Sequence, residues 1–335
     1  VDEQPDEPAW LRKSQRLHQV EEALAPGRWQ DRQADAAQVQ RVPLGQPRLQ
    51  LLGGVAQVAE PAALLQGPRP LGLEFGLQPG DLVIVAGRPS MGKTSLMMNI
   101  VEHVCIEQSK PSLVFSCEMS SFQIVQRLVF SRAKFALSQL TRGYKATKAD
   151  LTRIQRAATE VSAARMFIDD TPGITINEVR AKARRKKRDE GLEFIAIDYL
   201  QLMRSRTKQA ENSREREIAE ISAGIKSLAK ELQVPIVILA QLNRGPETRS
   251  GKSVGVPRMS DLRESGSIEQ DADLVGLLYR SAYYAEDEEE KEAEAGKAEL
   301  VLAKNRNGET GHVPLTFIAN LMRFESGPPA REFEA

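Results

Sequence analysis

Short apolar runs alternate with longer mixed stretches over most of the 335-residue chain. The apolar runs predict buried strands at 81–86, 112–116, 166–169, 194–197, 234–240 and 274–279. The longer stretches predict helices at about 94–107, 121–137, 148–164, 176–189 and 214–232. Strands that alternate with helices of ten or more residues are typical of a mainly parallel sheet with helices on both faces, so the pattern predicts an α/β fold.

The pattern changes near the C-terminal end of this α/β region. Two further apolar segments, 299–303 and 313–317, flank Asn307-Gly308. An Asn-Gly pair between such segments is typical of a hairpin turn. The sequence therefore predicts a C-terminal β-hairpin or a looped ribbon.

The first 70 residues differ from the rest, with eight prolines, many glutamines and no sustained strand pattern. Within about 9–25, Leu17, Val20 and Leu24 share one helical face. A linker with one docking helix and a mostly disordered tail both fit this composition. We therefore expect three parts: an N-terminal extension over 1–70, one large domain over 71–326 and a tail over 327–335.

Composition narrows the chemistry only moderately. The 46 basic and 46 acidic residues balance, so any contact with a polyanion must be a local patch. Cys105 and Cys117 are the only cysteines of the sequence and lie in no metal-binding motif, so we expect no structural zinc and a reducing, cytoplasmic location. No apolar run approaches the ~20 residues of a membrane helix, so we expect no membrane contact.

Three charged segments have open interpretations. Six of the seven residues at 182–188 are basic, which indicates either a solvated helix face or a contact with nucleic acid or a partner. The acidic run at 286–294 predicts a solvated loop without a catalytic role. The polar, basic loop at 204–216 either faces a nucleic-acid channel or is simply exposed to solvent.

The strongest chemical motif lies between the first predicted strand and the first predicted helix. Its residues match the P-loop pattern G-x-x-x-x-G-K-[ST], and this context disfavours a chance match in a glycine-rich turn. Glycines let successive backbone N–H groups face one phosphate, and a helix N-terminus attracts the anion. We expect Lys93 to bind the β and γ phosphates and Thr94 to ligate Mg²⁺. The expected nucleotide-binding residues are Gly87, Arg88, Pro89, Ser90, Met91, Gly92, Lys93, Thr94 and Ser95.

Three other strands supply candidates for the rest of an ATP site, because ligands bind at the carboxyl ends of parallel strands. Asp198 ends one apolar strand and is expected beside Thr94 as a second Mg²⁺ residue; an ordinary strand-end aspartate is the alternative. Glu118 follows another and would polarise the attacking water if its strand neighbours the P-loop strand; a charge near a helix N-terminus is the alternative. Gln241 follows a third and could sense the γ-phosphate.

With these residues in place, the chain from about 77 to 324 resembles the ATPase domain of the DnaB family of bacterial replicative helicases. The resemblance lies in the strings at 77–82, 88–94, 115–119, 197–203, 239–244, 260–273 and 304–308. It implies a RecA-like fold, a ring of six identical subunits, and ATP-driven movement along single-stranded DNA in the 5′ to 3′ sense.

The resemblance also implies roles for particular residues. Glu118 would activate water and Gln241 would sense the γ-phosphate. Lys304 and Arg306 would reach the γ-phosphate of the neighbouring subunit's ATP, where an arginine delivered in trans makes hydrolysis depend on assembly. The implied DNA contacts are Arg263, Glu264, Gly266 and Arg244. Because a carboxylate repels phosphate, Glu264 fits better as a residue that orients Arg263 or a backbone N–H.

The sequence departs from the family before the P-loop strand. Residues 1–60 do not resemble the family's N-terminal helical domain, which leaves open the docking of a primase or a helicase loader. Three hypotheses follow: a ring helicase motor, a RecA/RadA-type recombinase that forms filaments, and a truncated ATP-binding module that loads or regulates a helicase. The string at 260–273 and the Lys304/Arg306 pair favour the motor over the recombinase.

Overall fold

The structure, a computed structural model, describes residues 76–327 except 145, 205–212, 250–254 and 286; at 141, 248 and 263–266 it describes the backbone alone. The expected extension over 1–70, with its candidate helix at 9–25, lies outside the described residues. So do residues 328–335 of the expected tail and most of the loop at 204–216.

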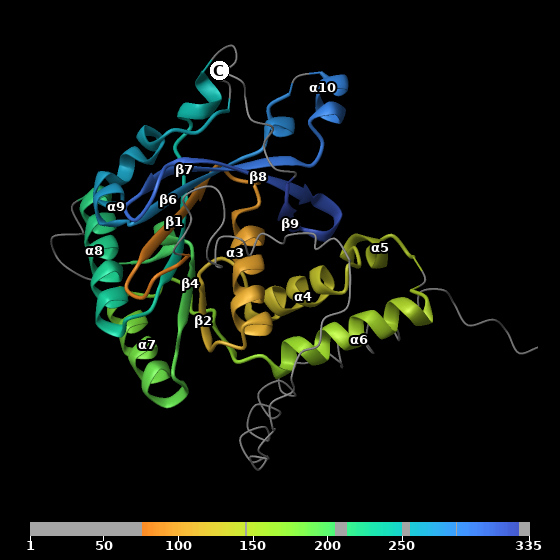
Figure 1. Ribbon diagram of the computed structural model, residues 1–335, viewed down its shortest axis with the longest axis horizontal. Helices are drawn as coiled ribbons and strands as arrows, with labels where there is room; N and C mark the ends of the chain where they lie inside the picture. Colours follow the sequence, from red (N-terminus) through yellow and green to blue (C-terminus); the bar gives the residue numbers. More distant parts are fainter. Residues whose placement is uncertain (1–75, 145, 205–212, 250–254, 286, 328–335) are drawn as a thin grey trace, which may run out of the picture. The chain divides into compact units, whose positions relative to one another are not determined.

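A nine-stranded sheet has the order β3-β2-β4-β5-β1-β6-β7-β8-β9 (Figure 1). The parallel strands are β1 (Leu82–Gly87), β2 (Ser112–Ser116), β3 (Met166–Asp169), β4 (Phe194–Asp198), β5 (Ile236–Gln241) and β6 (Leu274–Tyr279). The antiparallel strands that follow are β7 (Lys297–Asn305), β8 (Gly311–Ile318) and β9 (Arg323–Ser326). The predicted parallel α/β sheet with a C-terminal hairpin is therefore confirmed.

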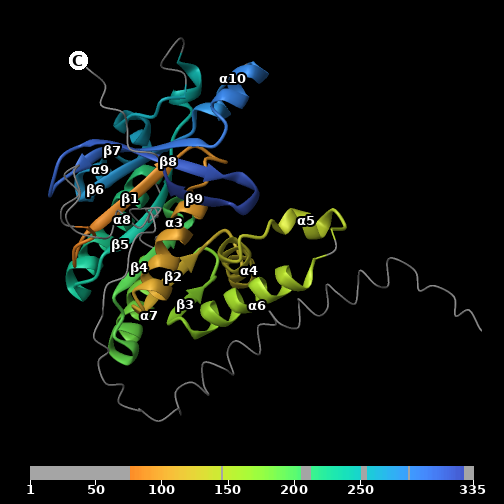
Figure 2. The same ribbon diagram turned by 45° about the vertical axis from the view of Figure 1, so that its right-hand side comes forward.

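Helices separate the parallel strands (Figure 2). The α-helices are α3 (Lys93–Glu102), α4 (Ser121–Arg132), α5 (Leu137–Thr141), α6 (Lys148–Ala163), α7 (Ile176–Glu190), α8 (Arg214–Leu232), α9 (Gly266–Asp271) and α10 (Glu288–Ala293). Shorter helical segments are η3 (His103–Glu107), η4 (Leu200–Leu202), η6 (Gly245–Thr248), η8 (Met259–Ser265), η9 (Ser281–Tyr283) and η10 (Ala319–Leu321). No helix among the described residues is both long and apolar enough to cross a membrane.

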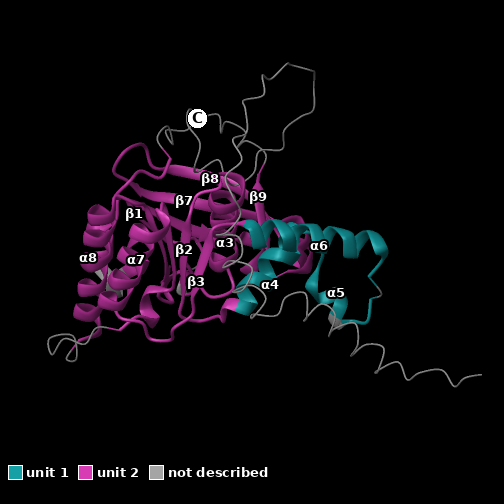
Figure 3. Cartoon of the chain, turned by 90° about the horizontal axis from the view of Figure 1, so that it is seen from below, with its two compact units in different colours: residues 1–57, 122–163 teal, residues 58–121, 164–335 magenta. Residues whose placement is uncertain are grey.

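Contacts divide the chain into two compact units, coloured separately in Figure 3. The described part of the smaller unit is Phe122–Ala163, where the ring of Phe135 contacts those of Phe130 and Tyr144. An ion pair between Arg132 and Glu160 lies within the same unit. The larger unit holds the entire sheet.

Side chains alternate between the two faces of the sheet, as the pleat requires. Leu82, Ile84 and Ala86 of β1 belong to a buried cluster that includes residues of α7, α8 and α9. Val83 and Val85, between them, are equally buried, and α3 contacts β1, β4 and β5. Figure 1 shows α3 and the α7–α8 pair on opposite sides of the sheet. The continuous apolar runs of these strands thus reflect burial on both faces.

Some predicted boundaries are wrong, each for a local reason. The helix expected over 121–137 ends at Arg132, and Lys134 adopts a left-handed φ of 50° that no α-helix continues. The strand expected from 234 begins at Ile236, because the Val234 N–H still bonds to Ala229 of α8. The acidic run forms the short helix α10 where a loop is expected, and β9 has no counterpart among the predicted strands.

Candidate functional site

The P-loop lies at the carboxyl edge of the parallel strands, between β1 and α3. Ser90 and Gly92 both adopt positive φ, 65° and 93°, which turns the backbone tightly before α3 begins. A Cβ at Gly92 would lie 3.0 Å from the ring of Phe324, so space and backbone both require glycine here. Such a turn directs N–H groups toward one anion.

The ammonium group of Lys93 bonds to an uncharged group in this turn. Its Nζ donates a hydrogen bond to the Arg88 carbonyl oxygen at 2.9 Å. Burial lowers the pKa of Lys93 to about 8, although the charges of Asp198 and Glu118 oppose the shift. The ammonium group therefore lacks the compensation that an anionic ligand would supply.

Thr94 and Asp198 meet at the same edge. The Thr94 hydroxyl donates to Asp198 Oδ2 at 2.7 Å, and Asp198, the last residue of β4, is only 2 % exposed. A hydroxyl and a carboxylate beside a phosphate cradle are the oxygen donors that Mg²⁺ takes when it also binds nucleotide phosphates. These two residues fit that ion, as the sequence predicts for their position.

Glu118 lies near the site although its strand is not beside the P-loop strand. Strands β4 and β5 separate β2 from β1, so β2 does not neighbour the P-loop strand, which was the condition attached to the role of Glu118. The charge of Glu118 nevertheless acts on both Lys93 and Tyr199, which places the exposed carboxylate near the phosphate end of the P-loop.

Gln241 lies next to the first P-loop residue. In the β1–β5 pairing it stands opposite Gly87. The side-chain amide of Gln201 bonds to the backbone N–H and to the carbonyl oxygen of Gln241, each at 3.2 Å. The backbone of Gln241 is thus clamped beside the nucleotide site while its exposed side chain remains available for a ligand.

Two arginines brace the P-loop from outside. The Arg88 guanidinium donates to Glu247 at 2.7 Å and to the Leu242 carbonyl at 2.9 Å, so this side chain faces the segment after β5. Arg280, at the end of β6, donates to the Ser90 carbonyl at 3.1 Å and stacks on Phe317 at 4.2 Å. No sequence signal points to Arg280, which is 190 residues from Ser90.

The Cys117 thiol is near the charges of this site. Burial, with the charges of Asp198 and Asp169, raises the pKa of its thiol to about 11. The thiol stays protonated and is a poor nucleophile, in agreement with its position in no metal-binding or catalytic motif.

Lys304 and Arg306 lie at the opposite end of the parallel strands, where the strands begin; we call this side the amino edge of the sheet. Asn305 of β7 stands opposite Leu274 of β6, which in turn stands opposite Val83 near the start of β1. From Val83 to Gly87, the strand rises about 13 Å at about 3.3 Å per residue. The two basic residues are therefore at the end of β1 that is remote from their own P-loop.

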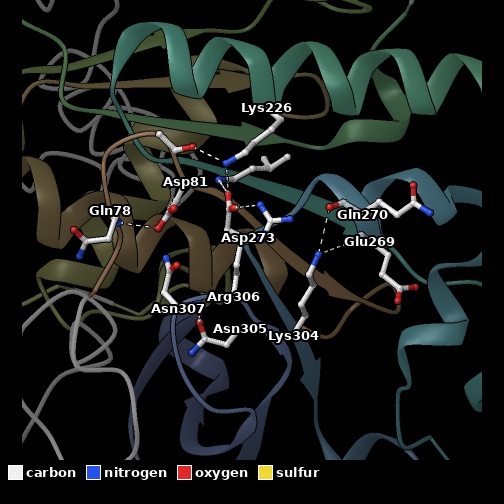
Figure 4. Close-up of polar contacts among 12 residues, drawn as sticks. Gln78, Asp81, Lys226, Glu269, Gln270, Asp273, Lys304, Asn305, Arg306 and Asn307 are labelled. Atoms are coloured by element: carbon white, nitrogen blue, oxygen red, sulfur yellow. Dashed lines mark hydrogen bonds and ion pairs between the residues drawn. The ribbon is translucent and has the colours of Figure 1, made fainter.

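A cluster of charged groups fixes this second edge (Figure 4). Asp273 accepts hydrogen bonds from Arg306 Nη1 at 3.0 Å and from the Leu82 N–H at 2.8 Å, and forms an ion pair with Lys226. Lys304 Nζ donates to the Glu269 carbonyl at 2.5 Å, near the C-terminal end of α9. Asp273 is the last residue of the string at 260–273, but the family resemblance assigns it no role. In the sequence, only its position directly before a buried strand points to it.

The predicted DNA contacts are only partly described. The backbone of Arg263, Glu264 and Gly266 runs from η8 into α9, and their side chains lie outside the described residues. Arg244 is exposed directly before η6. Asp261 of η8 pairs with Arg249 after η6, and its carbonyl accepts the Asn243 N–H shortly after the end of β5.

The basic run on α7 is compensated within the chain. Arg184 pairs with Glu231, Arg185 and Arg188 pair with Asp189, and Lys186 pairs with Glu190. Lys182 pairs with Asp169, and Lys187 donates to the Leu192 carbonyl. These partners favour the interpretation of a solvated helix face.

The P-loop between a buried strand and a helix, the Thr94–Asp198 pair and the mainly parallel sheet define a RecA-like P-loop ATPase fold. The family comparison agrees: residues 72–326 match the DnaB-like helicase C terminal domain, and the chain belongs to that family.

Relatives and solved structures give the same result. The replicative DNA helicase DnaB of Geobacillus stearothermophilus is 44% identical over 249 residues, covering 74% of this chain and 53% of that protein. The DnaB of Haemophilus influenzae is 45% identical over 260 residues, which are 77% of this chain and 54% of that protein. The chain spans about half the length of these curated relatives.

Among solved structures, an ATPase domain superposes with a TM-score of 0.69 at 33% identity, covering 76% of this chain and 87% of that one. A DnaB-like replicative helicase, whose structure was described with its interactions with primase, gives a TM-score of 0.66 at 32% identity. The superposition covers 74% of this chain and 58% of the helicase chain.

Proposed function

We propose that this chain is the motor of a replicative DNA helicase, which hydrolyses ATP to move along single-stranded DNA and to separate the duplex. The family membership supports the class of activity. The observation that carries the mechanism is the placement of the P-loop and of Lys304 and Arg306 at opposite ends of β1. One chain then offers a nucleotide site on one side and basic residues for a neighbour's site on the other.

Within one subunit, the P-loop backbone and Lys93 bind the phosphates of ATP, and Thr94 and Asp198 hold Mg²⁺. The ion, when bound, neutralises phosphate charge and orients the γ-phosphate. Glu118 accepts a proton from the attacking water, since its carboxylate is exposed and near Lys93. Gln241 contacts the γ-phosphate, and the clamp from Gln201 keeps its backbone in place.

Between subunits, Arg306 with Lys304 stabilises the charge that develops on the neighbour's γ-phosphate. An arginine in this role is worth about 10³–10⁵ in rate. A closed ring satisfies this arrangement for every subunit because each interface is the same, and we propose a homo-hexamer. Single-stranded DNA passes along the ring channel in the 5′ to 3′ sense, in contact with Arg263, Gly266 and Arg244, while Glu264 orients Arg263.

The proposed partners follow from the same family. A primase is proposed because a similar solved helicase was described with its interactions with primase. A helicase loader and a cytoplasmic location accompany replicative function. The recombinase hypothesis finds no support in the family match, and a truncated module that only binds ATP is the alternative that the experiment must exclude.

The test mixes two inactive variants. Lys93→Ala leaves a subunit with Arg306 but without a working P-loop, and Arg306→Ala leaves the reverse. Where the two adjoin in the correct order, one complete site is rebuilt at the shared interface. We expect ATPase activity to return on mixing, with closed hexamers visible by mass photometry in the presence of nucleotide.

Two outcomes contradict the proposal. If subunit exchange is demonstrated and no mixture is active although Arg306→Ala binds ATP, Arg306 does not act in trans. Persistent monomers with nucleotide would instead indicate the ATP-binding module, and open filaments would indicate the recombinase.

A further inference from the structure

Asp273 is the central residue of the charged cluster at the amino edge of the sheet. Its side chain is 6 % exposed, and its carboxylate accepts hydrogen bonds from the Leu82 N–H, Lys226 Nζ and Arg306 Nη1. Its backbone carbonyl also accepts the Arg306 N–H at 2.8 Å. One residue thus holds Arg306 by both backbone and side chain, as Figure 4 shows.

The surroundings keep this carboxylate ionised. Burial alone would raise the pKa of Asp273, but the Leu82 N–H and the charges of Lys226 and Arg306 together hold it below its ordinary value. The titratable groups that face it are Asp81, Lys226, Lys304 and Arg306. At neutral pH a fixed negative charge therefore lies directly behind the guanidinium.

Arg306 remains accessible despite this anchor. Its side chain is 52% exposed, whereas Asp273 is buried beneath it. A guanidinium carries five N–H donors in a rigid fork, and the anchor uses one of them. The fork can therefore be held from behind while its other donors face a ligand from outside the chain.

A purely architectural role is the competing explanation. Asp273 also joins the start of β1 to α8, because Lys226 bonds to both Asp273 and the Gly80 carbonyl. If that were its whole contribution, removing its charge would weaken every subunit equally. A role in orienting Arg306 would matter only in subunits that possess Arg306.

We propose that Asp273 is the positioning residue for Arg306: its buried carboxylate fixes the guanidinium at the angle and depth from which it enters the neighbouring subunit's ATP site. This inference rests on the proposed function, since it requires Arg306 to act in trans. Asp273 itself touches no substrate.

The experiment places Asp273→Asn in one partner at a time of the complementing mixture. In the first mixture the substitution is in the Lys93→Ala subunit, which donates Arg306. In the second it is in the Arg306→Ala subunit, which donates the P-loop. Asparagine keeps an oxygen for the Leu82 N–H but removes the charge that holds Arg306.

We expect the first mixture to lose about 10- to 100-fold of the restored turnover, the effect of a misplaced catalytic group. Its KM for ATP should be unchanged, because the P-loop subunit is untouched. The second mixture should retain the activity of the original pair. Asp271→Asn in the Arg306-donating subunit is the matched control, since it makes the same chemical change near α9 without this ion pair.

Equal losses in the two mixtures, or none in either, would overturn the inference while leaving the trans site intact. Absence of activity in the original pair would refute the proposed function, and the inference with it. If Asp273→Asn does not fold, Asp273→Glu replaces it. That variant keeps the charge but shifts it by about 1.5 Å, one C–C bond, and the same asymmetric loss is expected.

Discussion

Two lysines at opposite ends of strand β1 show how differently the molecule uses buried charge. Lys93, after the carboxyl end, has a carbonyl oxygen as its hydrogen-bond acceptor, and burial lowers its pKa to about 8. Lys226, near the amino end, pairs with the buried Asp273 and also bonds to the Gly80 carbonyl. Both side chains lose water, but only Lys226 gains a full countercharge within the chain.

The difference separates a site that receives a ligand from one that holds a residue in place. A buried cation whose nearby carboxylates do not offset its loss of water costs free energy until an anion binds, so the binding of phosphate is strengthened. The ion pair of Lys226 with Asp273 needs no ligand anion, and it rigidifies the elements that it connects. The carboxyl edge is thus arranged for a ligand, and the amino edge for the orientation of Arg306. Five measurements test this contrast, from the largest expected effect to the smallest.

Lys93→Ala should reduce ATP turnover by about 10³-fold or more, because a preorganised charge at the phosphates is removed. The unfolding free energy without nucleotide should fall by no more than about 1 kcal/mol, because the lost hydrogen bond is offset by removal of a buried charge. Steady-state ATPase assays and urea unfolding measure the two quantities. Turnover within tenfold of the parent would remove Lys93 from the site.

Lys226→Met should show the reverse pattern. Removing Lys226 leaves the buried Asp273 carboxylate with Arg306 as its remaining ion-pair partner among the described residues, which costs up to about 3–5 kcal/mol of unfolding free energy. Nucleotide affinity should stay within about threefold, since the P-loop is remote from this edge. A stability unchanged in urea titrations would contradict the role given to the amino-edge cluster.

Glu118→Gln should reduce hydrolysis by about 10²-fold or more while nucleotide binding persists, because the near-isosteric change removes only the base. Single-turnover assays with a parallel binding titration measure both. Glu193→Gln offers a control, as that exposed carboxylate pairs with Lys110 away from the P-loop. Full turnover in Glu118→Gln would leave the carboxyl edge without its assigned base.

Nucleotide affinity should depend on pH through Lys93. Its pKa of about 8 without ligand means that the ammonium loses its proton as pH rises through that value. Because phosphate binds the charged form, affinity should fall by about tenfold between pH 7 and pH 9. Calorimetric titration measures this, and the dependence should vanish in Lys93→Ala. A dependence that survives in that variant belongs to another group.

Arg263→Ala tests the segment that links the two edges, since η8 is tied to the end of β5 by Asp261 and α9 contacts Lys304. Weaker single-stranded DNA binding is expected, and the log–log salt slope should become shallower by about 0.7 for each phosphate that the variant no longer neutralises. DNA-free ATP hydrolysis should persist. An unchanged slope in fluorescence titrations would exclude Arg263 from the DNA path.

The sequence by itself determined the local elements and the motif within them. β6 has the limits that its apolar run predicts, and the P-loop is recognised from residues spaced within eight positions. Such features depend on neighbours along the chain: apolar runs specify buried strands, and the loop's glycines specify its backbone. The resemblance added roles for Glu118, Gln241, Lys304 and Arg306, which remain proposals.

Only the tertiary structure decided which distant groups meet. The order β2-β4-β5-β1 separates the strand before Glu118 from the P-loop strand. The pairing of β6 with β1 brings Arg280 to Ser90, across 190 residues, and the packing of the same sheet brings Lys226 to Asp273, across 47. A charged residue carries no local signal of its partner, because ion pairing depends on which strands adjoin and which side chains lose water together. Those conditions arise only when the whole sheet has formed.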